Sequence, residues 1–375
     1  MNNKVCLDSC DSYEETKLLQ IVRRQFTALQ VEIKSGMTVV IKPNLVTKAA
    51  PNSGIITHPK LVEAVGLVVQ ERGGNVLIAE SSGGLFTPTA MNAIFSACGY
   101  TEIAKRHNFS LYLDCESTSV DLPDAVLCKR MNVINPYIHA DYIINIAKLK
   151  SHCMTMLSGA VKNLFGTVPG LMKPELHCRF PNKSDFAQML VDLCEYVRPN
   201  LSIIDGIDAM EGDGPTGGVK RFMGVVIASE SPYAADMTAA AIANMNPASV
   251  LFLNHAARRG LCPKTTDSLE LLGDSIESHL KKDFKLPKSK DVDFIARLPR
   301  FLRPVAKKIA TPYPTIRRKQ CIGCGKCAES CPAHTIQIVD CKAVISYSSC
   351  IHCFCCHEMC PLHVIDIKRF SLFNL

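Results

Sequence analysis

The chain contains no tryptophan and no uninterrupted apolar run long enough to cross a membrane. A membrane-spanning helix needs about 20 predominantly apolar residues, and the best candidate, residues 239–253, is interrupted by Asn244, Asn246 and Pro247. The first residues, Met1 to Asp8, also lack the apolar core of a signal peptide. We therefore expect a cytoplasmic protein with no membrane span.

Two nucleotide-binding motifs are absent as well. The sequence has no G-x-x-x-x-G-K-[ST] loop and no G-x-G-x-x-G after an expected strand, so neither a P-loop nucleotide nor a dinucleotide cofactor is expected. The surplus of positive charge is confined to residues 281–320, which hold 13 Lys or Arg against three acidic residues. The rest of the chain has a net charge of −3, which argues against a nucleic-acid-binding body.

At 375 residues, the chain exceeds the usual size of a single core, and we expect two domains. In residues 1–280, short apolar stretches alternate with segments of helical length. This alternation predicts an α/β domain whose mostly parallel sheet carries helices on both faces. The expected strands are 39–41, 75–79, 142–146, 201–204 and 224–227, and the expected helices are 59–72, 89–106, 185–197 and 233–244.

Residues 281–320 are rich in proline and in basic residues, which is typical of a linker between domains. Within this segment, residues 294–309 could form a broken basic amphipathic helix. The segment is read as a solvated linker, with a docking surface for an acidic redox partner or a membrane-surface contact as alternatives. The second domain then comprises residues 321–375.

Cysteine is abundant and unevenly distributed. Ten of the 19 cysteines lie between Cys321 and Cys360, and so dense a thiol cluster in a reducing compartment indicates metal ligation. The 18 residues that begin at Cys321 recur from Cys350, with ten identical positions. Duplication of a small unit is the simplest account.

Each repeat has the pattern C-x2-C-x2-C-x3-C-P. Three closely spaced thiolates can hold three irons of a cubane cluster, and the fourth cysteine reaches across to the other cluster. Two 4Fe–4S clusters are therefore expected, one held by Cys321, Cys324, Cys327 and Cys360 and the other by Cys350, Cys353, Cys356 and Cys331.

This part of the chain resembles the bacterial two-cluster ferredoxin module, which implies a small α+β fold. A zinc ribbon is the alternative, but it leaves the third cysteine of each repeat and the two Cys-Pro pairs unexplained. Cys341 and Cys355 exceed the ligand count, and we expect both to be buried as small apolar residues.

Five polar segments separate the apolar stretches of the first domain. They include Lys42-Pro43-Asn44, Leu149-Lys150-Ser151-His152, residues 159–166, Asp205-Gly206 and Gly212-Asp213-Gly214-Pro215. This series resembles the family called domain of unknown function 362, over roughly residues 37–240. Several members of that family are fused to a ferredoxin-like end. The resemblance implies a family and no particular reaction.

The residue types in these segments suggest an anion site. Lys42, Lys150 and Lys162, with His152 and His177, would make a basic pocket suited to a carboxylate or a phosphate. The segment Ser81-Ser82-Gly83-Gly84 offers backbone N–H groups to an anion. We expect Lys150, His152, Lys162 and Asp205 to be catalytic, and Lys42, Asn44, Ser81, Ser82, Asn163 and Asp213 to bind the substrate.

Other interpretations of these residues stay open from the sequence. Lys42 could be an ordinary exposed residue at a strand end, Lys162 could face solvent, and His177 could be a lone surface histidine. The glycine-rich loop after Glu211 could be only a turn. A further possibility is a divalent cation held by acidic residues, for which the candidates are Asp205, Glu211, Asp213 and Asp236.

Taken together, these features predict an iron–sulfur protein of the kind found in anaerobes. Its C-terminal module would exchange single electrons with a redox partner protein and with an unidentified small anion held in the α/β domain. The alternative is a non-catalytic electron carrier, or a factor for iron–sulfur or metallocofactor assembly.

The repeats make a quantitative prediction. Protein prepared without oxygen should contain about eight iron atoms and about eight acid-labile sulfides per chain, because two complete ligand sets hold two cubanes. Colorimetric iron and sulfide assays on the purified protein measure both numbers. Bound zinc without iron would contradict the prediction.

Overall fold

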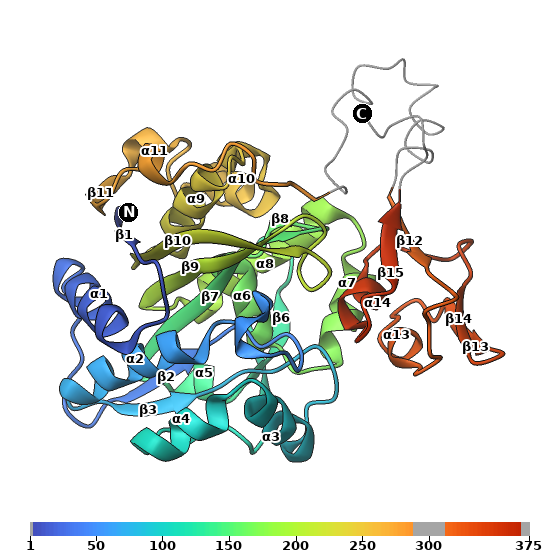
Figure 1. Cartoon of the computed structure of the whole chain (residues 1–375), viewed down its shortest axis with the longest axis horizontal. Coiled ribbons are helices and arrows are strands. Elements are labelled where there is room, and N and C mark those ends of the chain that lie inside the picture. Colours follow the sequence, from blue (N-terminus) through green and yellow to red (C-terminus); the bar gives the residue numbers. More distant parts are fainter. Residues whose placement is uncertain (1–2, 288–311, 369–375) are drawn as a thin grey trace.

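The computed structural model describes residues 3–287 and 312–368. A large main body, residues 3–287, is built on one central sheet, and a small C-terminal module, residues 312–368, lies at its side (Figure 1). Among the described residues, every helix is too short or too polar to cross a membrane.

The central sheet has nine strands and is mostly parallel. Strand β10 runs antiparallel to both β1 and β9, and every other neighbouring pair along the main path is parallel. The short strand β8 (Met156–Leu157) folds back on β7. The strand order is β11 (Glu270–Gly273), β1 (Lys4–Ser9), β10 (Val219–Ser229), β9 (Leu201–Glu211), β7 (Tyr142–His152), β2 (Thr38–Lys42), β3 (Asn75–Ile78) and β4 (Ser110–Leu111).

Helices cover both faces of this sheet, because successive side chains of a buried strand point to opposite sides. Val39 and Ile41 pack into one apolar cluster, and Val40 between them packs into the other. The first cluster contains residues of α1 (Glu15–Ala28), α2 (Pro59–Glu71), α3 (Pro88–Ala97) and α4 (Tyr100–His107). The second contains residues of α8 (Lys183–Val197), α9 (Pro232–Ile242) and α10 (Leu251–Arg258). The predicted fold class is confirmed.

The smaller elements of the main body complete the chain between these layers. A separate hairpin pairs β5 with β6. The remaining elements are β5 (Ser117–Asp121), β6 (Arg130–Ile134), α5 (Pro136–His139), α6 (Ala160–Asn163), α7 (Met172–Arg179) and α11 (Ile276–His279).

Each of the five predicted strands is present, but three are much longer than predicted, and one of them is β10, which begins at Val219 instead of Gly224. Strand β7 continues to His152, so Lys148, Lys150 and His152 lie within the strand and not beyond it. Strand β9 likewise continues to Glu211. The predicted helix 89–106 is divided into α3 and α4 at Gly99, whose positive φ of 82° a helix does not accommodate.

Two antiparallel strand pairs form the C-terminal module. β12 (Tyr313–Ile316) pairs with β15 (Ile365–Lys368), and β13 (Ile336–Val339) pairs with β14 (Lys342–Ile345). The short helices α13 (Lys326–Glu329) and α14 (Cys355–Met359) contact each other. Residues 313–316, which the sequence assigns to the linker, therefore form the first strand of the module. The expected amphipathic helix at 294–309 lies outside the described residues.

Candidate functional site

Two cavities in the C-terminal module are each lined by four cysteines. The first cluster cavity is lined by Cys321, Cys324, Cys327 and Cys360. The second cluster cavity is lined by Cys331, Cys350, Cys353 and Cys356. In both, the fourth thiol comes from the other repeat, as the spacing predicts.

Backbone amides support these thiols. The N–H of Val364 donates to Cys360 Sγ at 3.4 Å, and the N–H of Thr335 donates to Cys331 Sγ at 3.3 Å. Amide hydrogen bonds of this kind stabilise cluster thiolates, so the donor sets fit 4Fe–4S clusters. The prediction for Cys341 is wrong, because its side chain is exposed; Cys355 is buried as expected.

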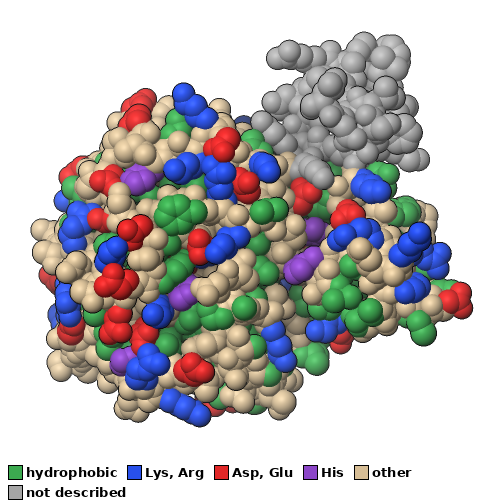
Figure 2. Space-filling view, in the orientation of Figure 1, with side chains coloured by type: hydrophobic (Ala, Val, Ile, Leu, Met, Phe, Trp, Pro, Cys, Tyr) green, Lys and Arg blue, Asp and Glu red, His purple; other side chains and the backbone are tan. Residues whose placement is uncertain are grey.

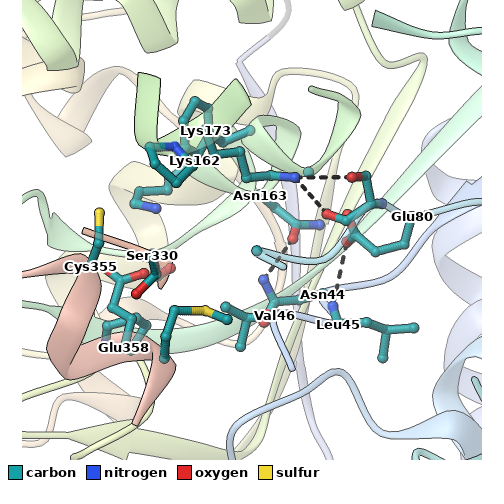
Figure 3. A pocket seen from close by; sticks show the side chains of 18 of the residues that line it. Asn44, Leu45, Val46, Glu80, Lys162, Asn163, Lys173, Ser330, Cys355 and Glu358 are labelled. Carbon is teal, nitrogen blue, oxygen red and sulfur yellow. Dashed lines mark hydrogen bonds between the residues drawn. The ribbon is translucent and has the colours of Figure 1, made fainter. Parts of the chain in front are cut away.

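A cleft lies where the main body and the C-terminal module meet. Its walls enclose about 700 Å³ of space, part of it open to solvent. The main body contributes Lys150, Lys162, Lys173 and His177, and the module contributes Ser330, Cys355, Glu358 and Met359. Figure 3 shows Lys162 and Lys173 on one side of this space, with Ser330, Cys355 and Glu358 across from Lys162. The cleft is thus built from both parts of the chain.

The lysines of the cleft differ in the hydrogen-bond partners of their ammonium groups. Lys150 Nζ donates to Asn44 Oδ1 at 2.7 Å and to the carbonyl of Ile55 at 2.9 Å. Burial and the nearby charge of Lys162 lower the pKa of Lys150 to about 7. Lys173 is enclosed by the carbonyl oxygens of Ser81, Ser82 and Val168, and burial lowers its pKa to about 7 as well.

Lys162 is the exception. It lies in α6, and its ammonium is 5.4 Å from the centre of the Phe165 ring. Within the described part of the chain, this ammonium makes no hydrogen bond and no ion pair. Asp236 fixes the start of α6, because its buried carboxylate accepts the N–H groups of Ala160 and Val161. The alternative that Lys162 simply faces solvent is therefore wrong, since it lines the cleft.

Lys42 forms a buried ion pair beside the cleft. Its ammonium lies 2.7 Å from Glu80 Oε2, and both side chains are fully or almost fully buried. Glu80 in turn accepts the N–H of Ser81. Gly166 packs against this pair so closely that a Cβ there would come within 1.9 Å of Glu80. Lys42 is thus a buried partner of Glu80, which lines the cleft, and is not an exposed strand-end residue.

Both histidines near the cleft are buried and neutral. His152 Nδ1 accepts the N–H groups of Met154 and Thr155, so the ring proton is on Nε2. That nitrogen lies 3.2 Å from Glu358 Oε1, and burial lowers the pKa of His152 to about 4. His177 stacks on Phe186 with ring centres 4.3 Å apart, and burial lowers its pKa to about 3. His177 is therefore not a lone surface histidine.

The glycine-rich loop, residues 212–218, holds the C-terminal module in place. His357 Nε2 donates to the backbone carbonyl of Asp213 at 2.9 Å, and Thr216 Oγ1 donates to the carbonyl of Glu358 at 3.1 Å. Gly217 lies so close to His357 that a Cβ would come within 2.5 Å of the ring. The loop is therefore more than a turn, because it fixes α14 against the cleft.

Several predicted residues lie together at the cleft, and others do not. Asn44, Ser81, Lys150, Lys162 and Asn163 line it. Lys42, Ser82, His152 and Asp213 support it from behind through Glu80, Lys173, Glu358 and His357.

Asp205 lies apart from the lining. Its carboxylate bonds Lys148 at 2.9 Å, Tyr13 at 2.8 Å and the N–H of His58 at 2.9 Å. Of the four acidic residues considered for a cation, Asp205, Glu211 and Asp236 each have a separate partner, and within residues 3–287 and 312–368 no three of the four are arranged to hold one metal ion. Sequence reasoning missed Lys173 and Glu358; the position of Glu358 between two ligand cysteines was a signal that could have found it.

Both parts of the chain match known protein families. Residues 39–241 match the family described as domain of unknown function (DUF362), and residues 313–361 match a 4Fe–4S dicluster domain. The "Thylakoid-associated protein sll1697" of Synechocystis is 32% identical over 323 residues, which is 82% of this chain and 94% of that protein.

A solved structure, the lactate racemase apoprotein from Thermoanaerobacterium thermosaccharolyticum, has 16% sequence identity and a TM-score of 0.33. The match covers 53% of this chain and 50% of that protein. A likeness of this size carries no argument about function.

The two kinds of lysine should respond differently to substitution. Lys42→Met should lower the free energy of unfolding by about 3–5 kcal/mol, because it leaves a buried carboxylate without its partner. Lys162→Met, the matched control, should not lower it, since no partner is lost and an uncompensated buried ammonium is removed. Denaturant unfolding followed by circular dichroism measures both. Equal losses in the two variants would refute the distinction.

The crossed ligand sets can also be tested. Cys331→Ser should damage the cluster held with Cys350, Cys353 and Cys356 more than the cluster of its own repeat, because Cys331 lines the second cluster cavity. Electron paramagnetic resonance of the reduced variant separates the two signals, and Cys341→Ser is the control that should leave both intact. If the variant lost only the cluster that Cys321 binds and kept the other cluster, the ligand sets would not cross.

Proposed function

Because the chain belongs to the domain of unknown function 362 family, whose name assigns no reaction, we propose a function from the cleft itself. We propose that this iron–sulfur protein is a ferredoxin-linked oxidoreductase that exchanges single electrons with a small anionic molecule in the cleft. The observation that carries the proposal is that Ser330 and Cys355 line the cleft, and each directly precedes a cysteine of the second cluster cavity. A molecule bound there would lie against the backbone that carries Cys331 and Cys356.

The charges of the cleft support an anionic substrate. Among the described residues, neither Lys150 nor Lys162 has a carboxylate within ion-pair distance, and Glu80 is already neutralised by Lys42. Against these cations the module supplies one carboxylate, Glu358. In a partly enclosed site, a charge-assisted bond to a carboxylate or phosphate is stronger than it is in water.

Other side chains can orient such an anion. The amides of Asn44 and Asn163 bond each other at 2.9 Å at the cleft wall, and both can also face a ligand. His177 Nδ1 is buried at the lining and has no hydrogen-bond partner among the described residues. An unsatisfied buried nitrogen is costly unless a ligand satisfies it, which supports a bound molecule with hydrogen-bonding groups.

Lys150 is suited to moving a proton. Its pKa of about 7 allows the side chain to exist in both protonation states at neutral pH. Two bound 4Fe–4S clusters would supply electrons one at a time, and a reduced anion commonly needs a proton as well. Lys150 can donate that proton from Nζ, while Lys162 holds the negative charge.

A non-catalytic carrier or an assembly factor remains the second candidate. A carrier has no need of a cleft with buried cations between its two parts, so the geometry favours the enzyme. The proposal includes a redox partner protein and a cytoplasmic location. Because a relative is described as thylakoid-associated, attachment to a membrane surface is the alternative location.

Substitution of the two lysines tests the anion site. Lys150→Ala and Lys162→Ala should each weaken binding of a small carboxylate or phosphate by about 10- to 100-fold, since each removes a charge-assisted contact. Isothermal titration calorimetry over a panel of such anions gives the affinities, and turnover with a reduced low-potential donor gives the activity. Lys105→Ala, at an exposed site on α4, is the control. Unchanged affinity in both lysine variants would place the site elsewhere.

The pH dependence has a defined sign. Lys150 is charged below its pKa of about 7, so anion affinity should be highest at lower pH and fall as the pH rises through 7. Lys150→Arg should keep the affinity and lose this pH dependence, because arginine stays charged. A parent protein whose affinity is flat from pH 6 to 8 would contradict the role of Lys150.

A further inference from the structure

Large apolar side chains that face solvent are concentrated on the C-terminal module. Of the twelve such side chains among the described residues, six belong to this module although it is much smaller than the main body: Ile322, Ile338, Val339, Val344, Tyr347 and Leu362. Ile322 is the most exposed of all twelve, at 64%. Clusters of exposed apolar side chains commonly mark a surface for another protein.

This apolar surface lies over the first cluster cavity. Ile322, Ile338 and Leu362, here called the apolar patch, line that cavity, and Cys324 beside them is exposed. None of the six exposed side chains lines the second cluster cavity. The first cavity is thus the one that an outside molecule can approach, whereas the second adjoins the cleft.

The module also carries exposed basic side chains, here called the basic rim. Arg318, Lys319 and Lys326 are exposed, and they lie close in sequence to Cys321 and Cys324. Residues 312–368 contain six Lys or Arg against four Asp or Glu, and Figure 2 shows blue side chains around green ones on this module. Arg317 is paired with Asp366, whereas no ion pair of Arg318, Lys319 or Lys326 is present among the described residues. An acidic partner complements such a surface.

We propose that the apolar patch and its basic rim dock a small acidic electron-transfer protein, which loads the first cluster. This proposal rests on the proposed function only in requiring the two clusters, and it uses no substrate. With flavodoxin as donor, the anionic flavin hydroquinone loses one electron and becomes the neutral semiquinone, and one bound cluster gains that electron. No proton enters or leaves this chain in the step. Electrons would then travel from the first cluster to the second and on to the cleft.

The experiment mixes the iron-loaded full-length protein with a reduced acidic flavodoxin in a stopped-flow instrument, without any candidate substrate. The variant Lys319→Glu/Lys326→Glu should lower the second-order rate constant by about tenfold at low ionic strength, and salt should abolish the difference. The control Lys60→Glu/Lys105→Glu carries the same charge change on α2 and α4 and should match the parent. Titanium(III) citrate, a small reductant, should reduce all of these proteins equally.

A second pair of variants tests the apolar contact. Leu362→Ser should weaken flavodoxin binding by about tenfold in calorimetry, since burying a leucine at an interface contributes to binding, and the affinities are compared between preparations of equal iron content. Val126→Ser, at a 61% exposed site of the main body, should bind like the parent. Binding and electron transfer that stay unchanged in both patch variants would overturn the proposal.

Two other occupants would give different results. If the parent is a dimer that Leu362→Ser dissociates, a second copy of this chain occupies the patch and the proposal is wrong. A membrane surface is the other possibility. It would be indicated if the parent binds anionic lipid vesicles, if Lys319→Glu/Lys326→Glu abolishes that binding, and if the same variant leaves the rate of reduction by flavodoxin unchanged. The proposal would then be wrong. Neither result bears on the cleft, because no substrate is present.

Discussion

The contact between α14 and the loop 212–218 is the constraint on which the candidate site depends. Through Thr216 and the carbonyl of Asp213, this loop holds α14 so that Glu358 faces His152. The opposite wall of the cleft is fixed separately, by Asp236 at the start of α6. Each wall is therefore held by its own hydrogen bonds, and the space between the walls is defined by a few hydrogen bonds across the two parts of the chain. Fixed walls suit a site that must hold a small molecule in one orientation.

Most of the buried lysines have partners that offset the free energy of removing an ammonium group from water. Lys42 and Lys148 are each neutralised by a carboxylate, and Lys173 is enclosed by carbonyl oxygens. Burying an ammonium without such partners is expensive. Lys150 is intermediate, with two neutral oxygen acceptors, and in the part of the chain that the structure describes Lys162 bonds neither a carboxylate nor a carbonyl. The residues least compensated within the protein are those at the cleft, where a bound anion would supply what is missing.

The fold and the cysteine pairing could be predicted from local patterns, whereas the site could be predicted only in part. The periodicity of strands and helices depends on residues that are close in sequence. The spacing of the repeats by itself predicts that Cys360 and Cys321 bind the same cluster. Glu358 and Lys173 are 185 residues apart in the sequence, and no local pattern in either segment predicts that the two side chains line the same cleft. Asp205 follows the same strand-end pattern as the cleft residues, yet Lys148 and Tyr13 hold its carboxylate elsewhere. Which polar groups pair with which is decided by tertiary packing.

Because α14 supplies both Cys356 and one wall of the cleft, the two tasks share one short helix. Without metal, the four cysteines of the second cluster cavity would have no common ligand to hold them together, and the wall they support would loosen. If the cleft binds the proposed anion, the affinity for that anion would then depend on whether iron is present in the module. A chain that has lost its iron would release the anion.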